Sequence, residues 1–181
     1  MRLFIGCSSN ENMPKEYVDD CTNLLEVVLK DNDLVFGAYD KGLMGVSYRI
    51  AKKNNRKVTG MCPEVYKENM KSLECDKEVV TKSIIDSTIQ IYENSDAIIF
   101  LPGGFGSLYE FFTANYFKVC KELDIPIIIY NSCGYYDKLI SFIKDMDEMG
   151  IIRKNESGHY FVANSVDEVV DYLKKKMLSK K

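Results

Sequence analysis

The sequence predicts an α/β protein in which helices cover both faces of a mostly parallel central sheet. Short apolar segments alternate with longer segments of helical periodicity along the chain, which is typical of βαβ units. The run Ala97–Leu101 is apolar at every position, as expected of a strand that is buried on both faces of a parallel sheet. Together these two observations predict a Rossmann-like, three-layer α/β/α fold.

The predicted elements follow this alternation in order. The predicted strands are Leu3–Gly6, Leu34–Phe36, Lys57–Met61, Ala97–Leu101 and Ile127–Tyr130. The predicted helices are Lys15–Leu29, Gly42–Lys53, Thr81–Asn94, Ser107–Glu122, Tyr135–Met149 and Val166–Lys175. The first helix has Pro14 near its first turn and an apolar face at Tyr17, Cys21, Leu24, Leu25 and Val28. The segment Pro63–Val80 has no clear period and is predicted to be irregular. Because no linker or repeat interrupts the pattern, residues 1–181 are predicted to form a single domain.

The composition is typical of a soluble globular protein. Hydrophobic residues make up 46% of the chain and charged residues 28%, with a net charge of −3. This charge argues against a nucleic-acid-binding surface, which needs a basic excess. The lysines Lys174–Lys176, Lys180 and Lys181 are predicted to be a solvated helix terminus. No segment approaches the ~18 apolar residues of a membrane-spanning helix, and no signal peptide is predicted.

The cysteines have no metal-site spacing. They are Cys7, Cys21, Cys62, Cys75, Cys120 and Cys133. With His159 as the single histidine, the chain lacks a convincing set of zinc ligands, so no metal and no cofactor are expected. Free thiols indicate a reducing compartment, and we expect a cytoplasmic protein. Cys7 follows the first predicted strand, but no base is predicted beside it, so we do not expect it to act as a nucleophile.

The most informative segment is Asp96–Phe112, in which an apolar strand is followed by a glycine-rich turn and a helix. The turn Pro102–Gly106 is predicted to need φ values that side chains forbid. Ser107 is the predicted N-cap of the helix, whose first amides attract anions, usually a phosphate. Glu110 lies one turn further on. Because its carboxylate would repel a phosphate, we expect it to serve the sugar of a nucleotide. The alternative is a structural turn in which Glu110 favours the helix dipole.

Three segments are predicted to meet at one edge of the sheet. Cys7–Asn10, Gly37–Gly42 and Pro102–Gly106 each follow a predicted strand directly. In parallel sheets, ligands bind at the carboxyl ends of the strands, near the point where strand order reverses. The three segments are therefore expected to form one ligand site.

The segment Pro102–Glu110, PGGFGSLYE, resembles the PGG-x-G-[TS]-x-x-E motif of the Lonely Guy (LOG) family, phosphoribohydrolases once described as lysine decarboxylases. Phe4–Ser9 resembles the first strand of the family and the turn that follows it, with the glycine and cysteine in swapped order. Asp33–Gly45 resembles the second glycine motif, and Ser95–Phe100 and Gly134–Phe142 fit as well. The resemblance covers nearly the whole chain.

The resemblance implies hydrolysis of the N-glycosidic bond of a nucleoside 5′-monophosphate to a free base and ribose 5-phosphate, without a metal. Glu110 matches the catalytic glutamate of the family. A carboxylate suits an oxocarbenium-like transition state, either as a base to water or as a partner of the ribose hydroxyls. The candidate phosphate- and nucleotide-binding residues are Gly103, Gly104, Phe105, Gly106, Ser107, Ser8, Ser9, Gly37, Gly42, Met44 and Gly45. The alternative for Gly42, Met44 and Gly45 is a purely structural role, in which a turn leads into a helix and the methionine packs in the core.

The chain departs from the family pattern in two places. The family has an arginine in the helix before the PGG strand, where Ser87 stands here without a charge. Lys82 and Arg49 are candidate cations, although a solvated surface position is the simpler interpretation of Arg49. In the triple-glycine loop, Ala38 and Tyr39 replace two glycines. Tyr39 is a candidate to stack on a base or to plug the pocket.

Three functions are open at this point. The first is the hydrolase, which the retained Glu110 favours. The second is a non-catalytic binder of a nucleotide or nucleotide derivative, such as a sensor, sequestering protein or carrier, which the missing arginine favours. Molybdenum-cofactor carrier proteins are similar at the glycine loop. The third, more weakly indicated, is a nucleoside deoxyribosyltransferase. The segment Cys62–Val79 is predicted to shape the base pocket, but the sequence does not indicate which base.

The resemblance also implies a homodimer whose sites lie near the subunit interface. The helix Ser107–Lys121 carries Tyr109, Phe111, Phe112, Tyr116 and Phe117. These side chains make more than one face of the helix apolar, so something beyond its own sheet is expected to cover it. A second copy of the chain would do so, and a well-covered central helix would show the same pattern.

Overall fold

The computed structural model describes residues 1–153 and 156–178 of the 181-residue chain. Within these residues, seven parallel strands form one sheet in the order β4-β3-β2-β1-β5-β6-β7. The strands are β1 (Arg2–Gly6), β2 (Asp33–Phe36), β3 (Val58–Pro63), β4 (Lys77–Thr81), β5 (Ala97–Phe100), β6 (Ile127–Tyr130) and β7 (Phe161–Ala163). The helices are α1 (Lys15–Val28), α2 (Gly42–Lys53), α3 (Lys67–Met70), α4 (Ile84–Glu93), α5 (Phe105–Val119), α6 (Asp137–Glu148) and α7 (Val166–Leu178). Short 3₁₀ segments are η1 (Glu64–Tyr66), η2 (Ser132–Gly134) and η3 (Glu156–Gly158).

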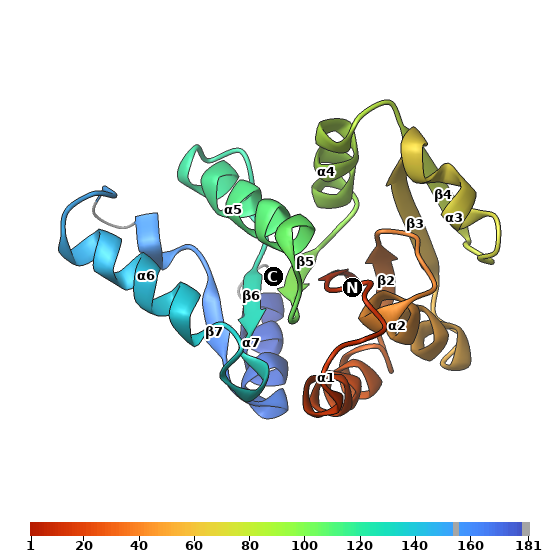
Figure 1. Ribbon diagram of the computed structural model, residues 1–181, viewed down its shortest axis with the longest axis horizontal. Helices are drawn as coiled ribbons and strands as arrows, with labels where there is room; N and C mark the ends of the chain where they lie inside the picture. The colour runs from red at the N-terminus through yellow and green to blue at the C-terminus, as the bar shows by residue number, and fades with distance from the viewer. Residues whose placement is uncertain (154–155, 179–181) are drawn as a thin grey trace.

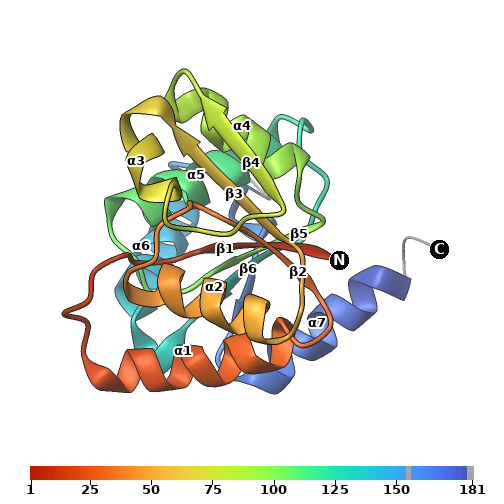
Figure 2. The same ribbon diagram turned by 90° about the vertical axis from the view of Figure 1, so that its right-hand side faces the viewer.

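Helices cover both faces of the sheet, which confirms the predicted three-layer fold (Figures 1 and 2). Successive side chains of β1 point to opposite faces. Leu3 and Ile5 belong to the core that contains buried residues of α1, α2 and α7. Phe4 belongs to the second core, which contains buried residues of α4, α5 and α6. The sheet is therefore apolar on both sides, as the run Ala97–Leu101 predicted.

The two edge strands carried no clear signal in the sequence. β4 pairs with β3 at one edge of the sheet, and β7 pairs with β6 at the other. The prediction that Pro63–Val80 is irregular is therefore wrong, because this segment contains η1, α3 and most of β4. β4 begins with the exposed, charged Lys77 and Glu78, and β7 has only three residues. Edge strands are often short and charged, and such strands lack the periodicity of central ones.

The helix ends differ from the predicted ones by up to three residues. α4 begins at Ile84 rather than at Thr81, because Thr81 still belongs to β4. Ser83 caps this helix, and its Oγ accepts a hydrogen bond from the amide of Asp86 at 3.1 Å. In the first helix, Cys21, Leu24, Leu25 and Val28 are buried as predicted, whereas Tyr17 is only partly buried.

The strand order changes direction at β1. From β1 the order runs through β2 to β4 on one side and through β5 to β7 on the other. The carboxyl ends of β1 and β5 therefore flank the switch point, where ligands bind in sheets of this kind.

Two further predictions concern the lysines near the C-terminus and the absence of a membrane-spanning helix. Lys174 and Lys175 are exposed on α7, as predicted for a solvated helix end, whereas Lys180 and Lys181 lie outside the described residues. Within the described part of the chain, no helix is both long enough and apolar enough to span a bilayer.

Candidate functional site

Three loops are joined by backbone hydrogen bonds at the switch point. The amide of Ser8, after β1, donates to the carbonyl of Pro102, after β5, at 3.1 Å. The carbonyl of Ser8 in turn accepts a hydrogen bond from the amide of Leu43, at the start of α2, at 2.9 Å. The loop after β1 therefore lies between the loop after β5 and the start of α2, and the three predicted segments do converge on one edge.

These loops surround a cavity of about 360 Å³, a size in the range of small-molecule sites. Its lining residues are Cys7, Ser8, Ser9, Asn10, Met44, Gly104, Gly106, Ser107 and Glu110. Seven of the residues singled out in the sequence thus lie around one cavity. Cys7 and Asn10 belong to the segment Cys7–Asn10 that was predicted to reach this edge, although neither was named as an individual binding residue.

The start of α5 forms one wall of this cavity. The helix begins at Phe105 with Gly104 as its N-cap, so the prediction that Ser107 is the N-cap is wrong. Ser107 lies instead in the first turn, where its side chain is buried. The first-turn amides of a helix have no intrahelical acceptor, and the helix dipole adds positive potential there. The wall can therefore bind an anion, and phosphate is the ligand most often found at such a helix start.

The glycines of this loop are required for space and not for unusual φ values. The described glycines with positive φ are Gly42, Gly134 and Gly150, so the prediction of forbidden φ values in Pro102–Gly106 is wrong. A Cβ atom at Gly104 would meet nothing within 4 Å, because this position faces open space. A Cβ atom at Gly103 would collide with the Ser107 side chain. Gly103 thus allows close packing, whereas Gly104 leaves room in the cavity.

Tyrosine side chains hold the outer side of the same loop. The hydroxyl of Tyr135 donates to the carbonyl of Gly103 at 2.8 Å, and that of Tyr136 donates to the carbonyl of Leu101 at 2.7 Å. The ring of Tyr17 on α1 packs edge-on against Tyr135, with 5.6 Å between the ring centroids. The loop carbonyls are therefore satisfied from outside, so the conformation of the loop does not depend on a ligand.

Glu110 lies one turn into α5 and faces the cavity. Burial raises the pKa of its carboxyl group from 4.5 to about 8. No charge of either sign contributes to this shift. The hydroxyl of Tyr92 on α4 binds the backbone carbonyl of Glu110 at 2.7 Å and not its carboxyl group. Glu110 is therefore largely protonated in the free protein at neutral pH.

The candidate cations do not lie beside Glu110. Ser87, which stands where the resemblance to the LOG family implies an arginine, is buried in α4 and does not line the cavity. Lys82 is exposed before α4 and does not line it either. Arg49 is exposed and forms an ion pair with Asp40. Neither Lys82 nor Arg49 therefore contributes a positive charge to the cavity lining.

The remaining candidate residues lie around the cavity without lining it. A Cβ atom at Gly42 would meet the backbone of Ser9 and Asn10, and one at Gly45 would meet Asp40 and Arg49. Gly37 faces the Met44 side chain, Phe105 is 95% exposed, and Tyr39 is partly buried outside the lining. No residue of Cys62–Val79 lines the cavity, so the predicted contribution of this segment to the pocket is not seen.

Cys7 is a buried thiol in the cavity wall. Burial raises its pKa well above the ordinary value, which leaves the thiol protonated and unreactive. The described residues contain no group of three or more His, Cys, Asp or Glu side chains that could hold a metal ion. The chemistry of the cavity therefore depends on Glu110, on Ser107, on Ser8 and Ser9 in the loop after β1, and on backbone amides.

The fold and the position of the cavity define the protein as a Rossmann-like α/β protein with a polar site at the switch point. The family described as "possible lysine decarboxylase" matches residues 44–173. Cytokinin riboside 5′-monophosphate phosphoribohydrolase LOG4 from Arabidopsis thaliana is 30% identical over 174 residues, which cover 95% of this chain and 81% of the relative. The probable cytokinin riboside 5′-monophosphate phosphoribohydrolase LOGL2 from Oryza sativa subsp. japonica is 31% identical over 174 residues, which cover 95% of this chain and 71% of that relative. The chain belongs to the LOG family.

Solved structures with the same fold include proteins that are named for the molybdenum cofactor and not as phosphoribohydrolases. The Moco carrier protein from Chlamydomonas reinhardtii matches with a TM-score of 0.71 at 16% identity, covering 99% of this chain and 98% of that one. The molybdenum cofactor binding protein from Rippkaea orientalis matches with a TM-score of 0.72 at 18% identity, covering 97% and 96%. At this level of identity the similarity shows the fold alone.

Proposed function

We propose that the protein hydrolyses the N-glycosidic bond of a nucleoside 5′-monophosphate, releasing a free base and ribose 5-phosphate. The observation that carries this proposal is the placement of Glu110 and the start of α5 around one cavity. An anion site and a carboxyl group one helical turn apart suit a ligand with a phosphate at one end and a sugar beside it. The phosphoribohydrolase names of relatives with 30% and 31% identity support the same reaction.

In the proposed reaction, the 5′-phosphate lies against the first-turn amides of α5 and the ribose lies over Glu110. The oxygen of a water molecule bonds to C1′ of the ribose, the bond from C1′ to the base nitrogen breaks, and the base takes up a proton. Positive charge develops on the ribose in the transition state. The ionised Glu110 stabilises this charge and accepts the proton of the attacking water.

The raised pKa of Glu110 is compatible with this role. A neutral carboxyl group does not repel an incoming phosphate, so the substrate can enter at neutral pH. A positive charge nearby favours the ionised form of a carboxyl group. Glu110 loses its proton to solvent before the bond breaks, and its ionised form then faces the developing charge, so we expect the rate of hydrolysis to rise as the pH approaches 8.

A second candidate function is binding of a nucleotide or nucleotide derivative without cleavage. The observation that favours it is the position of Ser87, where the family has an arginine, together with the lack of a charge effect on Glu110. A protonated Glu110 without a cation would donate a hydrogen bond to a ligand and leave its glycosidic bond intact. We place this alternative second, because the relatives named above are hydrolases.

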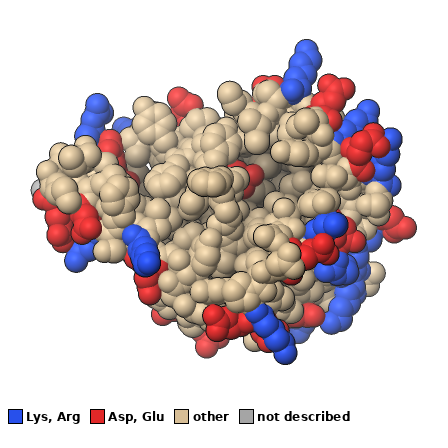
Figure 3. Space-filling view, viewed as in Figure 1, with Lys and Arg blue, Asp and Glu red and all other residues tan. Residues whose placement is uncertain are grey.

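We also propose that the protein is a homodimer in the cytoplasm. Large apolar side chains are exposed on adjacent helices, among them Ile84 and Ile85 on α4 and Phe112 and Tyr116 on α5. The face shown in Figure 3 carries few charged side chains at its centre and many at its rim. A second copy could cover this apolar area. All six cysteines are free, which supports a reducing compartment.

Product analysis tests the proposed function. The purified protein is incubated with a panel of nucleoside 5′-monophosphates, including AMP and N6-substituted AMP, and the products are separated by chromatography. We expect a free base and ribose 5-phosphate in equal amounts from at least one nucleotide. If every nucleotide stays intact while one of them raises the melting temperature, the hydrolase proposal is wrong and the binder is supported. Gel filtration with light scattering on the same sample tests the dimer.

A further inference from the structure

Two neighbouring tyrosines, Tyr135 and Tyr136, bond to the loop between β5 and α5. The hydroxyl of Tyr135 donates to the carbonyl of Gly103 at 2.8 Å, and that of Tyr136 donates to the carbonyl of Leu101 at 2.7 Å. Neither tyrosine lines the cavity at the switch point, so neither contacts a ligand there. The two bonds are alike in length, but they act on different peptide groups.

The bond from Tyr135 fixes the direction of one amide group. The peptide bond between Gly103 and Gly104 is trans, and a trans peptide has its C=O and N–H groups on opposite edges of one plane. Because the Gly103 carbonyl points to Tyr135, the N–H group of Gly104 points away from Tyr135. Gly104 lines the cavity and Tyr135 does not. The amide of Gly104 is therefore directed to the cavity side of the loop.

This peptide group needs a bond to hold its direction. Gly104 is the N-cap of α5, so its N–H group has no acceptor within the helix and is available to a phosphate at the helix start. Both residues of the peptide are glycines, and a Cβ atom at Gly104 would meet nothing within 4 Å, so the plane can rotate at little steric cost. A rotated plane would turn the carbonyl oxygen of Gly103 to the phosphate and repel it. The hydrogen bond from Tyr135 opposes this rotation.

The position of the Tyr135 hydroxyl is itself fixed by neighbouring segments. Directly before it, Gly134 has a φ of +74°, and a Cβ atom there would lie 2.7 Å from the carboxyl group of Asp137, so the chain makes a tight turn. The ring of Tyr135 packs edge-on against Tyr17 of α1, at 5.6 Å between centroids, and against Tyr136, at 4.8 Å. The hydroxyl is therefore held beside the loop in the free protein.

We propose that Tyr135 is a positioning residue for the phosphate of the ligand: its bond to the Gly103 carbonyl aims the Gly104 amide at the phosphate oxygens. The phosphate site at the start of α5 is the part of the proposed function on which this inference rests, and it is common to hydrolysis and to binding without cleavage. Without the bond, only a fraction of the molecules would have the amide in the right direction, and the apparent affinity for phosphate would fall by that fraction.

Tyr136 supplies a matched control. Its hydroxyl bonds to the carbonyl of Leu101, but the next residue is Pro102, which has no N–H group. Loss of this bond therefore turns no amide away from the phosphate. It does leave a buried carbonyl unpaired, because Leu101 is fully buried. Tyr136→Phe should consequently lower the melting temperature more than Tyr135→Phe.

The probe is ribose 5-phosphate, which carries the phosphate and contains no glycosidic bond to a base. Isothermal titration measures its affinity for wild-type protein, Tyr135→Phe and Tyr136→Phe. We expect Tyr135→Phe to weaken binding about fivefold, as for the loss of one ordinary hydrogen bond, and Tyr136→Phe to change it by less than about twofold. Melting curves followed by circular dichroism establish that each variant is folded.

The NMR signal of the Gly104 amide separates positioning from a general effect on stability. In the free protein, this signal should be shifted, broadened or doubled in Tyr135→Phe relative to wild type, because the peptide plane then has more than one direction. Saturation with ribose 5-phosphate should bring it to the position found in ligand-bound wild-type protein, because the phosphate selects one direction. In Tyr136→Phe, the free protein should give a single sharp Gly104 signal.

Three results would overturn the proposal. The first is that Tyr135→Phe keeps the wild-type affinity for ribose 5-phosphate or the wild-type Gly104 signal. The second is that Tyr136→Phe weakens binding as much as Tyr135→Phe, which would show that both tyrosines act through the stability of the loop. The third is that wild-type protein does not bind ribose 5-phosphate. Only this third result also counts against the proposed function, whereas the first two leave the phosphate site in place.

Discussion

The two sides of the switch-point cavity differ in what their glycines do. On the β5–α5 side, Gly104 and Gly106 have open space where a Cβ atom would lie, and Glu110 lines the same cavity. On the β2–α2 side, Gly42 and Gly45 have protein atoms within 3 Å of that position, and only Met44 reaches the cavity. Both sides belong to segments that resemble glycine motifs of the LOG family. Only the glycines of the β5–α5 side therefore leave space for a ligand, whereas Gly42 and Gly45 allow protein segments to pack closely.

The largest effect is expected on the β5–α5 side, from Glu110→Gln. If Glu110 acts as the general base, this change should lower kcat/KM for the best nucleotide by about 10²–10⁴. Binding of the 5′-monophosphate, measured by calorimetry, should change by less than about threefold, since Gln keeps the size of the side chain. The exposed control Glu122→Gln should keep full activity. Normal turnover by Glu110→Gln would show that the glutamate is not the base.

The second prediction compares one glycine from each side. Gly104→Val fills open space next to the start of α5, so it should weaken 5′-monophosphate binding by about 100-fold or more without unfolding the protein. Gly37→Ala should change binding by less than about threefold, because its Cβ atom would meet only the flexible end of Met44 at 3.3 Å. Isothermal titration of both variants measures the contrast. Equal losses in the two variants would remove the difference between the sides.

The third prediction concerns stability on the β2–α2 side. Gly42 has a φ of +54°, and a Cβ atom there would lie 2.6 Å from the backbone of Ser9. Gly42→Ala should therefore lower the free energy of unfolding by about 2 kcal/mol, from backbone strain and the clash. Gly104→Ala should leave it within about 0.5 kcal/mol, because that position is open. Urea unfolding of both variants decides whether the two sides differ in this way.

The last prediction concerns the pH dependence of stability that Glu110 imposes. Its pKa is 4.5 in the unfolded chain and about 8 in the folded protein, so unfolding releases a proton between these values. The folded state consequently loses stability as the pH rises through this window. Glu110→Gln removes this loss, so we expect its stability relative to wild type to increase by about 4 kcal/mol between pH 4.5 and pH 8. Urea unfolding at both pH values measures the difference, and a variant that shows no gain at pH 8 would contradict the raised pKa.

The central part of the fold was predictable because its signals are local. β5 and β6 are apolar at every position, and α5 begins directly after a run of glycines. β4 and β7 were missed because an edge strand has one free side and needs no continuous apolar run. The N-cap of α5 was misplaced for a related reason, since a serine in the first turn resembles a cap when only residue types are known.

The candidate site was predictable only in part. Ser8, Ser9, Gly104 and Gly106 were placed on one edge by the rule that strand ends meet there, whereas Met44 became a candidate through the family resemblance, and the structure brings these residues together. Tyr39, Ser87 and Lys82 were candidates because of their positions in the sequence, but none of them lines the cavity. Their side-chain environments depend on how α2 and α4 pack, and no sequence pattern contains that information.

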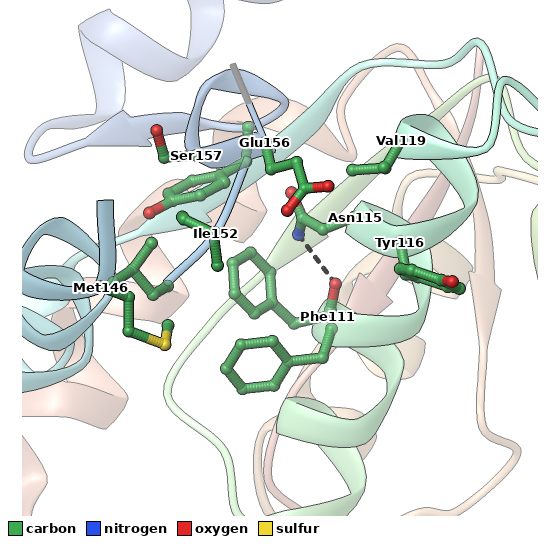
Figure 4. A pocket seen from close by; sticks show the side chains of 11 residues that line it. Phe111, Asn115, Tyr116, Val119, Met146, Ile152, Glu156 and Ser157 are labelled. Atoms are coloured by element: carbon green, nitrogen blue, oxygen red, sulfur yellow. Dashed lines mark hydrogen bonds between the residues drawn. The ribbon is translucent and has the colours of Figure 1, made fainter. Parts of the chain in front are cut away.

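The sequence by itself determined the fold class, the family and the position of Glu110 one turn after a glycine loop. These properties follow from periodicity and from residue spacing along one segment. Only the tertiary structure decided the protonation of Glu110, which depends on how completely neighbouring elements exclude water from it. Only the tertiary structure formed the cavity that is lined by Phe111 of α5, Met146 of α6 and Ile152, because these segments meet there from distant parts of the chain (Figure 4).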